Sequence, residues 1–203
     1  MVEREGSRLV LASASAFRRH MLEAAGIGFA VVTPDVDEAA LKSRLTGSGA
    51  TLKEVAQGLA VAKAEVVSAR LPDALVIGAD QVLACGADMF NKPASLAEAR
   101  EQLSRLRGKT HELHTAVALA AAGNALWTRV ETAILAMRAF SDAFLADYLA
   151  RQGERVCHTV GAYEIEGPGI QLMERIEGDM FTVIGLPLLA LLSELRARGA
   201  LAT

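Results

Sequence analysis

The stretch LVIGADQVLA, residues 75–84, indicates the fold class more clearly than any other part of the sequence. It is apolar nearly throughout, which is typical of a central strand that is buried on both faces of a sheet. Strand-like and helix-like segments alternate along the rest of the chain, and this alternation predicts an α/β architecture. A single carboxylate, Asp80, interrupts the apolar run.

The segments before this strand follow the same alternation. Hydrophobic periodicity and turn residues predict a strand over 9–13, a helix from Phe17 that ends at Gly26, a strand over 29–32, an acidic loop over 33–38 and a helix that the capping box Thr51-Leu52-Lys53-Glu54 begins. After the central strand, the predicted elements are a helix between a second capping box, Ser95-Leu96-Ala97-Glu98, and Gly108, a strand pair over 110–120 and 125–137 joined through Ala122-Gly123-Asn124, a helix capped by Ser141 that ends before Gly153, and a terminal helix over 186–198.

The bulk properties exclude several classes of protein. The 203 residues suit one domain or two closely packed lobes, and a net charge of -3 argues against a long binding surface for nucleic acid. The longest apolar stretch, residues 181–192, is too short to span a bilayer. Two widely spaced cysteines give no disulfide framework, and residues 1–8 contain no apolar run typical of a secretory signal. We therefore expect a cytoplasmic protein with no nucleic-acid or membrane partner.

Two carboxylates are candidate metal ligands. Asp80 lies in an apolar strand, where a charge is costly unless it is paired or holds a metal ion. Glu38 ends the acidic loop and could join Asp80 as a hard oxygen ligand of Mg²⁺ or Mn²⁺. The structural alternatives are that Asp80 caps a neighbouring turn and that Glu38 belongs to a solvated acidic loop.

Four further residues are candidates for binding phosphate. Ser13, Ser15 and Arg18 follow the first predicted strand at the start of a helix, where backbone N–H groups, hydroxyls and a guanidinium can bind an anion. Lys63 lies among alanines and a valine on its helix. The alternatives are ordinary capping by Ser15 with solvated arginines, and a Lys63 side chain that extends along the apolar surface to water.

Lys92, which precedes Pro93, is a further candidate phosphate ligand. The His111-Glu112-Leu113-His114 stretch does not have the HExxH helical spacing, and on a strand the two histidines point to opposite faces, so we expect no metal site there. Gly108-Lys109-Thr110 resembles the end of a P-loop, but Leu103 stands where that motif begins with glycine.

Taken together, these stretches resemble the Maf family of nucleoside triphosphate pyrophosphatases. The matching segments appear in family order and are LASASAFRR (11–19), DVDE (35–38), AVAKA (60–64), GADQV (78–82), NKP (91–93), GKTHELHTAV (108–117), GAYEIEG (161–167) and IGLPL (184–188). The resemblance implies an elongated α/β fold related to the inosine triphosphate pyrophosphatases, with a central mixed sheet flanked by helices and a cleft between two lobes of a single domain. It also implies a homodimer, a divalent metal and hydrolysis of a nucleoside triphosphate to the monophosphate and pyrophosphate.

The resemblance further implies roles for individual residues. It makes Asp80 the catalytic acid or base and places Ser13, Arg18, Glu38, Lys63 and Lys92 around phosphate and metal. The chain departs from the usual family pattern at Ala16, Asn91 and the stretch His158-Thr159-Val160. This stretch has no lysine where many relatives have one, so the loop loses a basic contact.

The resemblance also associates three positions with base selection, which here hold Phe17, Gln81 and Glu166. Their identities resemble the 7-methyl-GTP branch of the family more than the dTTP and UTP branch. The carboxylate of Glu166 can accept hydrogen bonds from the N–H-rich edge of guanine, and the ring of Phe17 can face a cationic base. The alternatives are that Phe17 packs in the core and Glu166 is a solvated turn residue. A rival function from another class is a nucleotide-binding regulator of cell division that needs no catalysis, and a third is a house-cleaning enzyme of inosine-like specificity.

Overall fold

The computed structural model describes residues 8–202, which form two compact units. The first unit contains the described residues up to Asp80, Thr115–Glu131 and the described residues from Gly185 onward. The second unit contains Gln81–His114 and Thr132–Ile184. Most of the N-terminal segment interpreted above, residues 1–7, lies outside the described residues.

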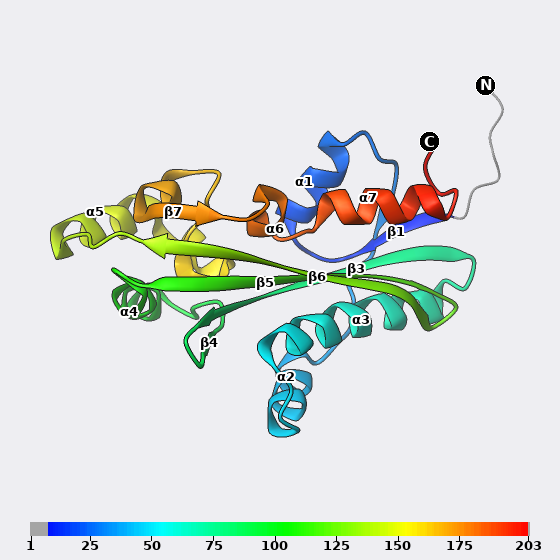
Figure 1. Cartoon of the computed structure of the whole chain (residues 1–203), viewed down its shortest axis with the longest axis horizontal. Helices are drawn as coiled ribbons and strands as arrows, with labels where there is room; N and C mark the ends of the chain where they lie inside the picture. Colours follow the sequence, from blue (N-terminus) through cyan, green and yellow to red (C-terminus); the bar gives the residue numbers. More distant parts are fainter. Residues whose placement is uncertain (1–7, 203) are drawn as a thin grey trace. The chain divides into compact units, whose positions relative to one another are not determined.

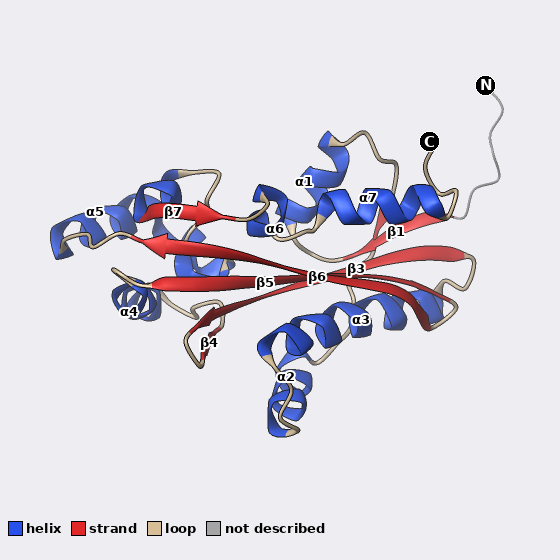
Figure 2. Ribbon diagram, in the orientation of Figure 1, coloured by secondary structure: helices blue, strands red, loops and turns tan. Residues whose placement is uncertain are grey.

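The strands form one mixed sheet of seven strands, in the order β2-β1-β3-β5-β6-β7 with β4 paired to β3 (Figures 1 and 2). Pairs β1/β2 and β1/β3 are parallel, whereas β3/β4 and β6/β7 are antiparallel. The strands are β1 (Arg8–Ala12), β2 (Ala30–Val31), β3 (Ala74–Cys85), β4 (Asp88–Phe90), β5 (Thr110–Ala121), β6 (Asn124–Met137) and β7 (Met173–Glu177). The predicted α/β class and mixed sheet are confirmed.

In the first unit, helices cover both faces of the sheet. Figure 1 shows α1 (Ala16–Ala24) and α7 (Leu188–Ala197) on one face and α3 (Leu52–Arg70) on the other. The reciprocal capping box predicted at Thr51 and Glu54 is present at the start of α3. The apolar stripe of α3 is buried through Val55, Leu59 and Val67, which explains why this helix was readable from periodicity.

Helix α2 (Glu38–Gly47) was not predicted. None of its residues is buried, so its sequence has no apolar stripe that would indicate a helix. Asp37 caps it by accepting a hydrogen bond from the backbone N–H of Ala40 at 2.9 Å. The acidic loop therefore ends one residue earlier than predicted, and Glu38 is the first residue of a helix.

The second unit has its own apolar core. It contains α4 (Leu96–Leu106), α5 (Asp142–Gln152), three 3₁₀ segments over Gly153–His158, Val160–Ala162 and Pro168–Leu172, and the short α6 (Met180–Ile184). Residues from β3, α4, β5, β6 and α5 supply the core, including Leu83, Leu103, Leu135 and Leu145. Ser95 caps α4 as predicted, but Glu98 accepts a hydrogen bond from the N–H of Ala94 rather than of Ser95, so the reciprocal box there does not form.

The turn between β5 and β6 has the geometry that a two-residue hairpin requires. Ala122 and Gly123 both have positive φ, at 47° and 80°. Such backbone matches the twist of the strands that it joins. No helix within residues 8–202 is long and apolar enough to cross a membrane.

Candidate active site

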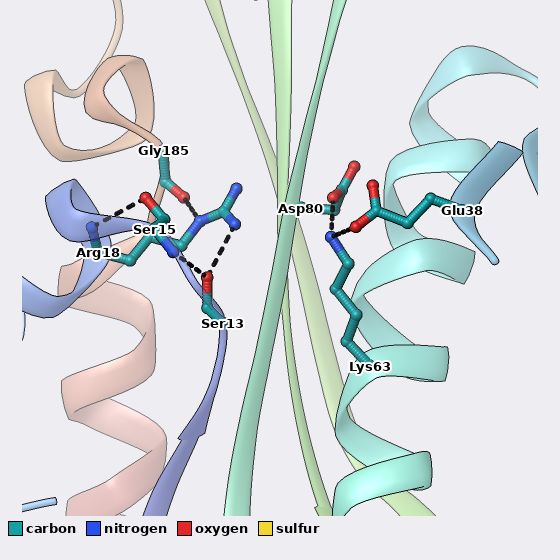
Figure 3. Close-up of polar contacts among 7 residues, drawn as sticks. All are labelled: Ser13, Ser15, Arg18, Glu38, Lys63, Asp80 and Gly185. Carbon is teal, nitrogen blue, oxygen red and sulfur yellow. Dashed lines mark hydrogen bonds and ion pairs between the residues drawn. The ribbon is translucent and has the colours of Figure 1, made fainter. Parts of the chain in front are cut away.

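Asp80 lies in the first unit and forms a buried ion pair with Lys63. The Asp80 side chain extends from β3 and is 6% exposed, and Lys63, on α3, is 5% exposed. The Lys63 Nζ atom donates to Asp80 Oδ1 at 2.5 Å and lies 2.8 Å from Glu38 Oε1 (Figure 3). The buried carboxylate is therefore compensated by a charge, as the sequence required.

The proximity of β3 and α3 depends on Gly78. A Cβ atom at Gly78 would lie 2.2 Å from the carbonyl oxygen of Ala60 and 2.7 Å from the backbone nitrogen of Ala64, so only glycine allows this approach. Gly78 and Asp80 are two residues apart on a strand and therefore face the same side. The close backbone contact between β3 and α3 at Gly78 therefore places Lys63 next to Asp80.

Lys63 does not extend along the apolar surface to water, which was the alternative interpretation of its sequence position. Its side chain is buried and its ammonium bridges two carboxylates that come from different elements. Glu38 is the more accessible of these partners, with 46% of its side chain exposed. A buried cation between two anions fixes both side chains in a site that water reaches from the side of Glu38.

The turn after β1 assembles a second polar group. Arg18 donates from Nε to the carbonyl oxygen of Gly185 at 2.8 Å and from Nη1 to Ser13 Oγ at 3.4 Å. Ser15 caps α1 by accepting from the backbone N–H of Arg18 at 3.4 Å, and its own N–H donates to Ser13 Oγ. Figure 3 shows the Arg18 guanidinium directed toward the strand that carries Asp80.

Electrostatics couples these two groups. Burial lowers the pKa of Arg18, whereas the negative charges of Asp80 and Glu38 act to raise it. An arginine remains protonated at neutral pH. The site therefore combines two cations, Arg18 and Lys63, with two carboxylates. Lys63 is engaged by both carboxylates, so Arg18 is the cation that can bind an anionic ligand near Asp80.

The carboxylate pair fits a divalent cation of the hard type. Oxygens of Asp80 and Glu38 lie within 2.8 Å of the same nitrogen, so both can reach a shared ion. Within residues 8–202, no group of three or more His, Cys, Asp or Glu side chains gathers at one point. Mg²⁺ is commonly held by one or two carboxylates together with substrate phosphates, so two protein ligands are sufficient.

The other candidate residues are distributed between the units. Phe17 is half-buried on α1, while its neighbours Met21 and Leu22 are buried. In the second unit, Lys92 and Glu166 are exposed. Gln81, also in the second unit, donates from Nε2 to the carbonyl oxygens of Thr182 and Val183 at 3.0 and 3.1 Å.

The two histidines of the 111–114 stretch are both buried and engage different partners. His111 Nε2 lies 2.7 Å from the hydroxyl of Tyr163. His114 Nδ1 lies 3.0 Å from Thr132 Oγ1, and its Nε2 lies 3.4 Å from Glu112. Each ring therefore belongs to a side-chain network of the second unit.

Two glycines near the site, Gly78 and Gly185, stand in segments that match the Maf family, but the sequence interpretation gave neither of them a role of its own. Gly78 was read only as part of the strand, although a glycine inside an apolar strand indicates a close backbone approach. Gly185, whose carbonyl oxygen accepts from Arg18, lies 167 positions further along the chain and gives no local signal. Its φ of 129° does require glycine.

Comparisons with known proteins identify the family of the chain. A family model described as Maf-like protein matches residues 8–198. A Brucella abortus protein named 7-methyl-GTP pyrophosphatase is 50% identical over 189 residues, which cover 93% of this chain and 95% of that protein. A Granulibacter bethesdensis protein named nucleoside triphosphate pyrophosphatase is 49% identical over 194 residues, which cover 96% of this chain and 98% of that protein. Because the family model matches nearly all of the chain, the chain belongs to the Maf-like protein family.

Proposed function

We propose that this protein is a nucleoside triphosphate pyrophosphatase that hydrolyses its substrate to a nucleoside monophosphate and pyrophosphate. The observation that carries the proposal is the Asp80–Lys63–Glu38 cluster, in which Asp80 and Lys63 are buried and which the Arg18 guanidinium faces from the start of α1. This combination supplies a carboxylate base and cations for a polyphosphate. Two relatives of similar length, at 50% and 49% identity, carry names for this activity.

The residues divide the work as follows. Asp80 accepts a proton from the water that attacks the α-phosphorus. Arg18 binds phosphate oxygens with a planar guanidinium that Gly185 and Ser13 hold in place. Lys63 offsets negative charge that develops near Asp80 during the reaction. Lys92, an exposed residue of the second unit, stays a predicted phosphate ligand. Ser13 and Ser15 stabilise the turn between β1 and α1 in a conformation that can surround the anion.

We propose a divalent cation, Mg²⁺ or Mn²⁺, as the cofactor, held by Asp80 and Glu38. When bound, it would offset phosphate charge and make a coordinated water more acidic. The support is the chemistry of the donor set, two carboxylates that lie close to one another because both contact Lys63. A homodimeric state and a cytoplasmic location stay predictions from the sequence.

The proposed substrate is 7-methyl-GTP or another purine nucleoside triphosphate. Glu166 is exposed on a turn, where its carboxylate can accept hydrogen bonds from guanine, and half-buried Phe17 can offer part of its ring face. The relatives named 7-methyl-GTP pyrophosphatase support this choice over dTTP or UTP. Gln81 would act on base selection indirectly, because its side chain binds the backbone carbonyls of Thr182 and Val183 in α6.

A nucleotide panel tests the proposal directly. Purified protein is assayed with 7-methyl-GTP, GTP, ITP, dTTP and UTP in Mg²⁺ or Mn²⁺, and pyrophosphate and the nucleotide product are both identified. We expect a monophosphate product and a higher kcat/KM for 7-methyl-GTP than for dTTP. A diphosphate product, or no turnover of any nucleotide, would reject the proposed reaction, whereas a preference for dTTP would reject only the proposed base.

Glu166→Gln separates the base assignment from the chemistry. The amide replaces an acceptor with a group that also donates, so the preference for 7-methyl-GTP should narrow by about 1–3 kcal/mol, the cost of one mispaired polar contact. Glu174→Gln, on β7 of the same unit, is a control that changes the charge equally. Unchanged selectivity in Glu166→Gln would exclude the role of this carboxylate.

A further inference from the structure

The turn that carries Glu166 begins with a strained backbone. Gly161 and Ala162 both have positive φ, at 77° and 61°. Ala162 is fully buried, and only two non-glycine residues within 8–202 have such a φ, Ala162 and Ala122. A Cβ atom at Gly161 would lie 2.5 Å from Leu83 and 2.7 Å from the ring of Tyr163. A side chain rarely adopts this conformation unless its surroundings impose it.

A buried tyrosine from α5 holds the strained residue. The hydroxyl of Tyr148 donates to the carbonyl oxygen of Ala162 at 3.1 Å, and Tyr148 itself is 4% exposed. This bond fixes the direction of the peptide that follows Ala162. Without it, the carbonyl would be buried with one fewer donor and the residue could relax toward negative φ.

A second tyrosine, the next residue along the turn, is held from β5. Tyr163 lies 2.7 Å from His111 Nε2, and the two rings are 5.7 Å apart between centroids. His111 is 1% exposed, and burial lowers its pKa to about 4, so the ring is neutral at physiological pH. His111 Nδ1 has no hydrogen-bond partner among the described residues.

Within this pair, the His111 ring uses one of its two nitrogens to bind a described residue. A buried polar pair in which one atom stays unsatisfied is less favourable than an apolar pair of the same shape. The role that the contacts offer is to hold Tyr163, and with it the backbone next to Ala162.

The remainder of the turn folds back on Glu164. The N–H of Gly167 donates to the carbonyl oxygen of Glu164 at 3.2 Å, and a Cβ atom at Gly169 would lie 2.5 Å from the same oxygen. Arg155 donates to the Glu164 carboxylate at 2.9 Å. Glu166 is exposed within this fold, and among the described residues no hydrogen bond or ion pair holds its carboxylate. Its position therefore depends on the backbone.

We propose that Tyr148 and Tyr163 are positioning residues that hold the turn of residues 161–169 in the conformation that presents Glu166 to the base. The inference rests on the proposed function, because the role of Glu166 belongs to it. Neither tyrosine contacts substrate in this scheme. They act through Ala162 and the backbone between it and Glu166.

The test uses Tyr148→Phe and Tyr163→Phe. In each variant the KM for 7-methyl-GTP should rise about fivefold to tenfold, which corresponds to the loss of one buried hydrogen bond. The kcat should stay within about twofold, since Asp80, Lys63 and Arg18 lie in the other unit, and the KM for dTTP should change little. Thr132→Val removes the contact to His114 in the same unit and should leave selectivity unchanged.

Two double variants distinguish positioning from mere stability. Glycine adopts positive φ readily, so Ala162→Gly added to Tyr148→Phe should recover most of the selectivity. His111→Leu combined with Tyr163→Phe removes both polar partners. This double variant should regain the melting temperature that Tyr163→Phe alone loses, but it should not regain the lost selectivity for 7-methyl-GTP. If selectivity returns together with melting temperature in this second pair, the tyrosine is structural only and the inference is wrong.

Hydrogen exchange makes the inference independent of the substrate assignment. Amides of residues 161–169 should exchange faster in Tyr148→Phe than in the wild type, with amides of β1 and α3 unchanged. If the wild type shows no preference for 7-methyl-GTP, the proposed base is wrong, and exchange alone still decides whether the turn is held. Unchanged exchange over 161–169 overturns the inference whatever the substrate.

Discussion

Asp80 shows how one side chain is accommodated and used at the same time. A carboxylate inside an apolar strand needs a compensating charge, and Lys63 supplies it from the neighbouring helix. The same lysine binds Glu38, so three charged groups are held together at a position where most strand residues are apolar. At the residue scale, stability and chemistry depend on the same contacts.

Asp80→Asn should abolish turnover and preserve the fold. Asparagine has nearly the same shape, and Lys63 keeps Glu38 as a partner, but an amide is a poor base and a weak metal ligand. We expect kcat to fall by more than tenfold, a barrier increase above about 1.4 kcal/mol. The circular dichroism spectrum should stay that of the folded protein, but the melting temperature should fall because the buried Lys63 loses one of its two anionic partners. Asp35→Asn, whose side chain is 88% exposed, is the matched control. A variant that keeps a tenth or more of wild-type kcat excludes the assigned role.

His111 predicts a pH-dependent stability. Its folded-state pKa of about 4 lies below the ordinary value of 6.5, so the unfolded chain binds more protons between these two pH values. The free energy of unfolding should therefore fall as the pH decreases from 6.5 to 4, by up to about 3 kcal/mol, and this residue should cause no further loss below pH 4. Urea unfolding of wild type and His111→Leu across this range isolates the effect. Parallel pH profiles would show that His111 does not titrate in this way.

At the element scale, the packing of β3 against α3 matters most. The two elements touch backbone to backbone at Gly78, which sets the distance over which Lys63 reaches Asp80. Helix α2, in contrast, buries none of its residues and supplies Glu38 from its first position. One carboxylate of the cluster therefore comes from a tightly packed strand and the other from a helix without buried residues.

Gly78→Ala should damage stability and activity together. The added methyl group would meet the Ala60 carbonyl oxygen and the Ala64 backbone, neither of which can move without shifting α3. Overpacking of this kind costs typically 1–3 kcal/mol, and here the obstacle is backbone rather than a flexible side chain. We expect a lower melting temperature and a lower kcat/KM.

Gly28→Ala provides the comparison for this experiment. A Cβ atom at Gly28 would have no heavy atom within 4 Å, and the φ of Gly28 is not positive. This substitution should therefore leave the melting temperature and kcat/KM unchanged. Equal effects of the two substitutions would show that the close approach at Gly78 is not what positions Lys63.

At the scale of the whole molecule, activity should depend on a divalent metal and not on thiols. The candidate ligands are carboxylate oxygens, and both cysteines are free. A chelator should abolish pyrophosphate release, and Mg²⁺ or Mn²⁺ added in excess should restore it. Reducing agents should have no effect. Full turnover in excess chelator would contradict the metal assignment, and inactivation by alkylation of Cys85 or Cys157 would reveal a functional thiol.

The sequence by itself determined the elements whose signals are local. The apolar run around Asp80 predicted β3, Thr51 and Glu54 predicted the start of α3, and Ser141 predicted the cap of α5. These signals are readable because a capping side chain lies within three residues of its partner, and because burial on a face repeats at the period of the element. The order of the Maf motifs along the chain also indicated the class of protein, a nucleoside triphosphate pyrophosphatase.

Only the tertiary structure decided how these elements meet. The sequence did not distinguish a snorkelling Lys63 from a buried one, because the answer depends on Asp80, 17 residues away, and on the absence of a Cβ atom at Gly78. Arg18 and Gly185, and Tyr148 and Ala162, are likewise joined by contacts between separate segments. Helix α2 was missed because a helix with no buried residue leaves no pattern in the sequence. Local propensity and periodicity encode elements, whereas the ion pairs and hydrogen bonds of the site exist only once packing has brought distant residues together.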